Sequence, residues 1–197
     1  MKRTYKLITF LTAMGIAVFV TSCEKTDTEV VNKSAATEEC AQQNPDRGEN
    51  CDFTAVLTED EIANLLHMRE EEKVARDVYL KFFELYNMPV FANIAQSEQK
   101  HMDAVLNLVE GYGLTDPVAD KAEGEFTADF QELYDNLVAE GSESITAAYQ
   151  VGVKIEERDI ADLEECIAST EVENILRVYN NLLAGSGNHL NAFSSKL

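Results

Sequence analysis

Glu98 and His101 are the residues whose type and spacing most directly indicate chemistry. They lie three residues apart in a run whose apolar members, from Phe91 through Ile94 to Val105, step by three and four residues, as the inward-facing positions of a packed helix do. A buried carboxylate is costly unless a partner or a cation offsets its charge. A Glu-x-x-His pair on an inward helix face is also how helical bundles hold two metal ions. The pair therefore predicts a buried metal site.

A second candidate ligand lies in an earlier helical run. Glu72 is the only charged residue on the apolar stripe that extends from residue 65 to residue 86. The alternative interpretation is that Glu70, Glu71 and Glu72 together form a solvated acidic face. The stripe favours an inward Glu72 and leaves Glu70 and Glu71 in solvent. His67 lies off the stripe and is expected to be exposed.

The third run places two carboxylates among apolar residues. Glu156 and Asp159 interrupt the stripe between residues 145 and 166, although a neighbouring register would turn Glu157 or Asp162 inward instead. We favour Glu156 as a ligand. Asp159 is either a further ligand or an acceptor that fixes the ring of a ligating histidine.

The last run contributes His189, on an apolar stripe from residue 175 to residue 192. A lone core histidine usually hydrogen-bonds a backbone carbonyl, but its alignment with three acidic stripes favours a metal ligand. The candidate metal ligands are therefore Glu72, Glu98, His101, Glu156, Asp159 and His189. Carboxylates with two imidazoles suit iron or manganese, and zinc stays an alternative.

The elements that must position these residues are helices. Residues 55–197 form the helical domain, with long helices at residues 58–87, 91–109, 142–168 and from 170 onward, and capping boxes at Thr58–Glu61 and Thr170–Glu173. Between the second and third of these, residues 112–125 form a loop and residues 126–141 a short helix. A connection of about 30 residues lets the second and third long helices run parallel, as in an all-α four-helix bundle with one crossover. Gly185 and Gly187 predict a kink or bulge in the last helix.

The N-terminal part of the chain indicates export. Residues 1–22 have a basic start and an apolar stretch too short to span a membrane comfortably, which is typical of a signal peptide. The small residues before Cys23 resemble a bacterial lipobox, and this resemblance makes Cys23 a lipid anchor. Residues 23–54 are polar and without period, so we expect a flexible acidic tether. Cys40 and Cys51 lie in it, and an oxidising compartment favours a disulfide between them over two free thiols.

The charge of the chain excludes some partners. The formal net charge is −20, and removing residues 1–22, which carry three positive charges and no acids, leaves −23. Such a surface repels nucleic acid and anionic lipid and attracts cations. We therefore expect no nucleic-acid partner. A membrane is expected as a partner only through the lipid anchor, and we also allow for a homodimer.

Four segments together resemble the ferritin-like di-metal carboxylate superfamily, especially its rubrerythrin-like members. Residues 72–79 resemble the first-helix Glu-x-x-Ala-Arg-x-x-Tyr segment, and residues 98–101 match the first Glu-x-x-His motif. Residues 155–160 occupy the position of the third-helix glutamate, and residues 189–193 resemble the segment after the second Glu-x-x-His motif. The chain is also similar to an uncharacterised family of exported bacterial ferritin-like domains. The resemblance implies a ferritin-like bundle with a non-haem di-iron centre that oxidises Fe(II) or reduces oxygen or peroxide.

One departure from the family pattern leaves other functions open. Ser186 stands where the second motif should carry a glutamate, so Asp159 replaces that carboxylate or the site is asymmetric, with one ion. No Cys-x-x-Cys pair supplies a built-in electron donor. The expected function is a membrane-anchored lipoprotein of the bacterial cell envelope, periplasmic or surface-facing, with di-iron oxidase or peroxidase chemistry. The alternatives are a non-catalytic metal-binding or buffering module and a metal-free interaction domain. We expect Tyr79 and Tyr149 to fill the core near the site, and the alternative is that they hydrogen-bond the ligands.

Overall fold

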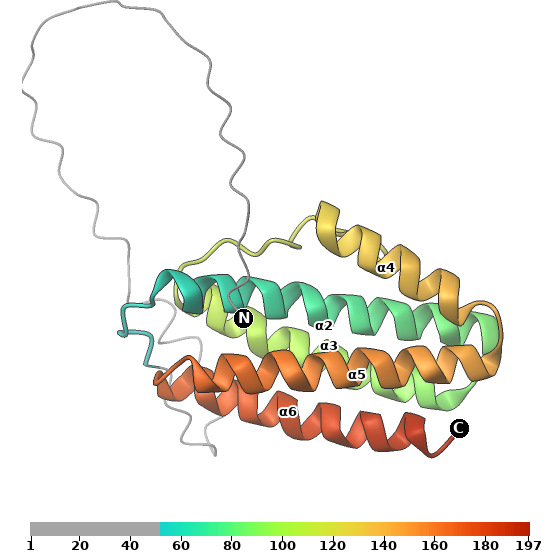
Figure 1. Cartoon of the computed structure of the whole chain (residues 1–197). Helices are drawn as coiled ribbons and strands as arrows, with labels where there is room; N and C mark the ends of the chain where they lie inside the picture. Colours follow the sequence, from blue (N-terminus) through green and yellow to red (C-terminus); the bar gives the residue numbers. More distant parts are fainter. Residues whose placement is uncertain (1–51) are drawn as a thin grey trace, which may run out of the picture. The chain divides into compact units, whose positions relative to one another are not determined.

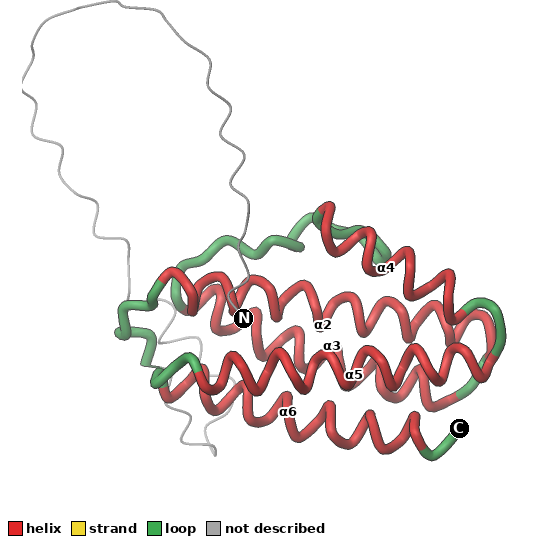
Figure 2. The backbone as a smooth tube through the Cα atoms, in the orientation of Figure 1, coloured by secondary structure: helices red, strands yellow, loops and turns green. Residues whose placement is uncertain are grey.

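A computed structural model describes residues 52–197, and all regular structure in this range is helical. The helices are α2 (Glu59–Tyr86), α3 (Pro89–Gly111), α4 (Ala128–Gly141), α5 (Ile145–Ala168) and α6 (Glu173–Ser194). No strand occurs between residues 52 and 197, so the prediction of an all-α domain is confirmed (Figure 2). Cys23, Cys40 and Cys51 lie outside the described residues, as does the segment 1–22. Within residues 52–197, no helix is both long and apolar enough to cross a membrane.

The four long helices lie alongside one another (Figure 1). Helix α2 packs against α3 and α5, and α6 packs against α3 and α5, which places α2 diagonally opposite α6. Helices α3 and α5 run in the same direction because the connection at residues 112–144 returns along the outside of the helices before α5 begins. The short helix predicted in this connection is α4, and it packs against α2 and α5.

The helix ends follow local chemistry in some places and tertiary contacts in others. The capping box at the start of α2 is present, with the Thr58 side chain accepting from the backbone of Glu61. Pro89 opens α3, two residues earlier than expected, because proline suits the first helical position. The predicted box at Thr170 is wrong. The Thr170 hydroxyl donates to Glu61 on α2 at 2.6 Å, and α6 begins after Val172 without a side-chain cap.

The apolar core consists of two clusters that lie one after the other along the bundle. One contains Tyr79, Phe82, Phe91, Tyr149 and Phe193, and the other contains Leu65, Met68, Val105, Leu163 and Leu182. Each long helix contributes to both clusters and carries polar residues at the turn between them. On α2, for example, Met68 belongs to one cluster and Ala75 to the other, with Glu72 between them. A layer of polar side chains therefore divides the core.

Helix α2 is buried on a second face as well, which corrects the expectation that Glu70 and Glu71 are solvated. They are only 5% and 7% exposed. Glu70 accepts hydrogen bonds from the backbone and hydroxyl of Thr127, just before α4, and Glu71 accepts from Arg158 of α5. His67 is half-buried rather than exposed. The acidic run faces inward because the crossover and α5 cover the side of α2 that a periodicity argument assigns to water.

The same polar face of α2 anchors the crossover. Lys73, which is 2% exposed, donates to the backbone carbonyls of Ala122 and Glu125 and pairs with Asp77 at 2.6 Å. Asp77 in turn accepts from the backbone of Gly124 at 2.9 Å. Burying two charges without such partners would cost several kcal/mol. The pair and the loop backbone satisfy one another, so the position of the crossover is fixed by α2.

Candidate metal centre

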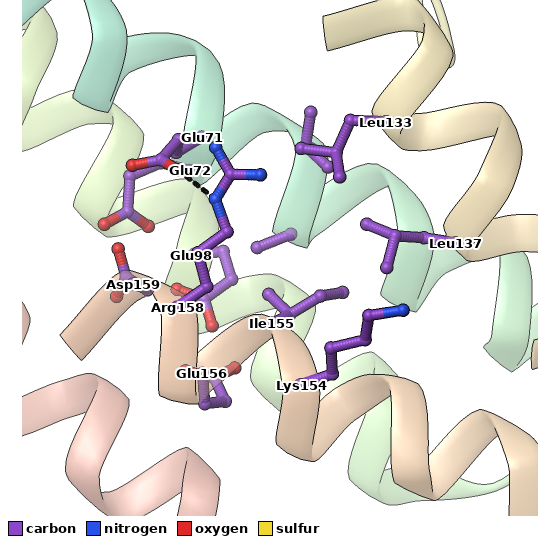
Figure 3. Close-up of a pocket in the computed structure, with 12 residues that line it drawn as sticks. Glu71, Glu72, Glu98, Leu133, Leu137, Lys154, Ile155, Glu156, Arg158 and Asp159 are labelled. Carbon is purple, nitrogen blue, oxygen red and sulfur yellow. Dashed lines mark hydrogen bonds and ion pairs between the residues drawn. The ribbon is translucent and has the colours of Figure 1, made fainter. Parts of the chain in front are cut away.

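The structure brings the predicted ligands from four helices to the layer between the two core clusters. Five of them form two overlapping groups of buried side chains, Glu72, Glu98 and His101, and Glu98, Glu156 and His189. Within each group the ligand atoms lie within 4.8 Å of one another. Figure 3 shows the carboxylates of Glu72, Glu98, Glu156 and Asp159 gathered on one side of a cavity between α2 and α5. On α5 Glu156 is buried and Glu157 is exposed, so the favoured register is the one the helix adopts.

Glu98 lies at the middle of the arrangement, shared by both groups. Its Oε2 is 2.7 Å from Nδ1 of His101, and its Oε1 is 2.8 Å from Nδ1 of His189. Each histidine faces one further carboxylate, Glu72 at 3.3 Å from His101 and Glu156 at 3.6 Å from His189. The two imidazole rings are 5.6 Å apart and 29° from parallel. Glu98 therefore offers one carboxylate oxygen to each of the two groups, and it could contribute a ligand atom to both.

Several buried oxygen and nitrogen atoms of the candidate ligands have no hydrogen bond in the described part of the chain. They are Oε1 of Glu72, Oε1 of Glu98, Nδ1 of His101, Oδ1 of Asp159 and Nδ1 of His189. Buried polar atoms without partners are rare in folded proteins because each costs free energy. Cations placed among these atoms would remove that cost, and the negative charges of the four carboxylates match two divalent ions. The residues therefore fit metal binding, and the oxygen and nitrogen ligands suit iron or manganese, or zinc.

The electrostatics of the centre favour protons when no cation is bound. Burial opposes protonation of both histidines, but the facing carboxylates outweigh it and raise the pKa of His101 to about 10 and that of His189 to about 9. Burial raises the pKa of Glu156 to about 7 and that of Asp159 to about 8. At neutral pH, protons on the histidines and carboxylates of the metal-free centre therefore offset the negative charge that bound cations would otherwise offset.

Asp159 and Ser186 form a unit beside the two groups. Ser186 is completely buried, and its hydroxyl donates to the Asp159 carboxylate. Asp159 belongs to neither three-residue group, and its hydrogen bond goes to Ser186 rather than to a histidine ring. Ser186 of α6 thus holds an aspartate of α5, and the second oxygen of that carboxylate has no hydrogen bond within residues 52–197.

The two tyrosines near the centre differ in role. Tyr79 is completely buried, and its hydroxyl donates to Oε1 of Glu156 at 2.6 Å. Tyr149 stacks on Phe91 with ring centroids 5.4 Å apart. We expected both to fill the core. Tyr149 does so, whereas Tyr79 also orients a carboxylate of the centre.

Gly185 and Gly187 lie in α6, where we expected them to mark a kink or bulge. That prediction is wrong, because α6 is one continuous α-helix from Glu173 to Ser194. A Cβ atom on Gly185 would lie 2.6 Å from both Cε1 and Nε2 of His101. The absence of a side chain lets the His101 ring approach the α6 backbone while its Nδ1 faces Glu72 and Glu98. Nothing lies within 4 Å of the corresponding position on Gly187.

The fold and the centre define the class of the protein as an all-helical domain whose buried carboxylate and histidine clusters are able to hold metal. Residues 61–197 match the family described as an uncharacterized protein domain, DUF2202, and the chain belongs to this family. It is 49% identical over 138 residues to the uncharacterized protein MJ0754 of Methanocaldococcus jannaschii, covering 70% of this chain and 75% of that protein. The crystal structure of the hypothetical protein MJ0754 superposes with a TM-score of 0.70 at 48% identity, covering 71% of this chain and 81% of that one.

Substituting the two glycines of α6 separates the effect on the centre from the effect on the helix. Gly185→Ala should displace the His101 ring and lower metal affinity by at least about tenfold, because it moves a direct ligand. Gly187→Ala is the matched control, and it should leave metal affinity unchanged and stabilise the helix by roughly 0.5–1 kcal/mol. Titration calorimetry with Mn²⁺ and thermal unfolding measure the two effects. Equal metal affinity in both variants would contradict the role of Gly185.

The raised pKa values predict how stability depends on pH. A folded state that binds protons more tightly than the unfolded chain loses stability as pH rises. The histidine contribution is complete below the unfolded pKa of about 6.5 and is lost as pH rises toward the folded values of about 9 and about 10. Metal-free protein should therefore unfold at lower temperature at pH 9.5 than at pH 7, and added Mn²⁺ should stabilise it more at the higher pH. Scanning calorimetry with and without chelator tests both predictions. Stabilisation by Mn²⁺ that shrinks as pH rises would contradict the raised histidine pKa values.

Proposed function

We propose that this chain is a ferritin-like di-metal carboxylate protein whose centre holds two iron ions and carries out oxidase or peroxidase chemistry on Fe(II), oxygen or peroxide. The observation that carries the proposal is Glu98, whose two oxygens each face a different histidine with a further carboxylate beyond. The parallel course of α3 and α5 around one crossover supports the ferritin-like assignment. The resemblance of the Glu72 and Glu98 segments to rubrerythrin-like proteins favours iron over manganese and zinc.

The chain's own residues supply what such chemistry needs around the ions. Bound iron would provide the electrons that reduce oxygen or peroxide. Glu156, as a ligand, would be deprotonated. Asp159 belongs to neither ligand group, and burial raises its pKa to about 8 in the metal-free chain, so it is the carboxylate placed to hold a proton that this reduction consumes. Tyr79 keeps the Glu156 carboxylate in one orientation through its 2.6 Å hydrogen bond.

The cavity beside the centre limits what reaches it. It has a volume of about 290 Å³, and its walls include apolar side chains of α2, α4 and α5, namely Val74, Ala75, Leu133, Leu137 and Ile155. Glu72, Glu98, Glu156 and Asp159 also line it, so the cavity opens directly on the candidate ligands (Figure 3). A cavity of this volume is large enough for oxygen or peroxide to reach the candidate ligands.

A second candidate function is a metal-binding module without redox activity. Ser186 favours it, because the α6 carboxylate of the family pattern is absent and Asp159 stands outside both three-residue groups. Such a centre would hold zinc or buffer metal. A metal-free interaction domain is the least supported alternative, since it leaves buried polar atoms around Glu98 without hydrogen bonds.

Exposure to air distinguishes these candidates. Protein produced without residues 1–22 and loaded anaerobically with Fe(II) should bind about two iron ions and develop a ferric absorption band in air. The double substitution Glu98→Ala and His101→Ala should remove both the bound iron and the band. Protein that is isolated with zinc and develops no ferric band after treatment with Fe(II) and air supports the second candidate. Unchanged metal content in the double variant would mean that binding is confined to the acidic surface and would overturn the proposal.

We also propose that the domain is exported to the cell envelope and anchored there through a lipid on Cys23. The basic start, the apolar stretch and the small residues before Cys23 support this proposal. Mass spectrometry of the protein from membranes tests it. A mature N-terminus at Cys23 carrying acyl chains is the expected result, and an unmodified Cys23 in the mature chain would contradict the anchor.

A further inference from the structure

A third group of metal-capable side chains lies on the face that α2 and α5 share, outside the buried centre. His67 and Glu71 are one turn apart on α2, and Asp162 lies opposite on α5. Nε2 of His67 is 3.3 Å from Oε2 of Glu71 and 4.0 Å from Oδ2 of Asp162. One ligand atom from each residue fits within a span of 4.8 Å. An imidazole and two carboxylates from two helices are a mixed ligand set suited to a divalent cation.

Two oxygens of this group are buried and lack hydrogen bonds. They are Oε2 of Glu71 and Oδ2 of Asp162, and no donor within residues 52–197 reaches them with hydrogen-bond geometry. Glu71 as a whole is only 7% exposed, so water does not readily replace the missing donors. Both oxygens face the same small space beside His67. A cation in that space would satisfy both carboxylates at once.

Arg158 is the cation that the chain itself places near this space. Its Nε lies 2.9 Å from Oε1 of Glu71 and 3.5 Å from Oδ2 of Asp162. The Arg158 side chain is 41% exposed, in contrast to the buried carboxylate that it contacts. A long, partly solvated side chain is able to swing into water when another cation arrives. Arg158 therefore competes with an incoming ion instead of sealing the site.

The group is joined to the buried centre by the cavity. Glu71 and Arg158 line the cavity together with Glu72 and Asp159, and Figure 3 shows Glu71 and Arg158 on the same side of it as the other carboxylates. His67, at 32% exposure, is the most solvent-exposed member of the group. A series of acidic side chains thus leads from a solvent-contacting imidazole to the ligands of the centre.

We propose that His67, Glu71 and Asp162 form an outer site that binds a divalent cation and delivers it through the cavity to the buried centre. Binding at the outer site stands on these three residues alone. Only delivery rests on the proposed function, because it requires the buried centre as its destination.

Titration of the full chain with Co²⁺ tests the binding step, because the visible absorption of Co²⁺ reports its ligands. The wild-type chain should show buried and outer classes of bound Co²⁺. Combining Glu98→Ala with His101→Ala should remove the buried class and keep the outer one, whereas His67→Ala with Asp162→Asn should weaken only the outer class, by at least about tenfold. An outer class that survives the second pair of substitutions overturns the proposal. A wild-type chain that binds Co²⁺ at the outer site but shows no buried class would instead count against the proposed function.

Arg158→Gln provides an independent test that does not remove a ligand. Freeing Glu71 and Asp162 from the guanidinium should strengthen Co²⁺ binding at the outer site by about tenfold, corresponding to 1.4 kcal/mol. Lys154→Gln is the matched control, because Lys154 also lies on α5 and lines the cavity but pairs with Glu140. An equal gain in both variants would mean a general charge effect and would overturn the outer site.

The delivery step is measured by the rate at which the buried class fills. Stopped-flow mixing with Co²⁺ should show that His67→Ala with Asp162→Asn slows filling of the buried class by about tenfold while the final occupancy stays the same. Glu157→Gln, which removes an exposed acid of α5 outside the group, should leave the rate unchanged. Equal rates in wild type and in the His67 and Asp162 variant would refute delivery.

Discussion

The structure depends on placing acidic and imidazole side chains in the middle of its own core. Glu98 is 2% exposed and has a histidine at each carboxylate oxygen, an arrangement whose desolvation must be offset by packing elsewhere. The two apolar clusters on either side of the polar layer provide that packing, because all four long helices contribute to both. Burial on each side also keeps the ligand-bearing turns of the helices at one level. The layer is therefore enclosed by apolar core at both ends, and it opens sideways on the cavity between α2 and α5.

Helix α2 is buried on two sides, and each side carries charged residues. Its inward side carries Glu72, and its opposite side carries Lys73 and Asp77, which bind the backbone of the crossover. Both sides contact residues distant in sequence, so α2 is surrounded by protein over most of its length. This explains how a helix with so many charged residues can be the most buried of the five in the described part of the chain.

The sequence was sufficient to predict which candidate ligands face inward, because regular helices keep a fixed register. The three-four spacing places Glu72, Glu98 and His189 inward, and each is buried in the structure. Spacing failed where burial has another cause. Glu71 faces α5, a partner that the periodicity of α2 alone cannot reveal. Gly185 was taken for a break because its function depends on an imidazole ring from α3. These errors arise because contacts between helices cannot be predicted from the sequence periodicity of one helix, whereas the register of each helix can.

The cavity wall and the candidate ligands come partly from different helices, and this has an evolutionary consequence. Helix α4 contributes Leu133 and Leu137 to the cavity wall but supplies no member of the two ligand groups of the centre. It packs against α2 and α5 from outside, and Glu98 and both histidines lie on other helices. Changes of side-chain size on α4 would therefore reshape the cavity without replacing a candidate ligand. Members of the family could thus diverge in the space beside the centre while retaining the same ligand groups.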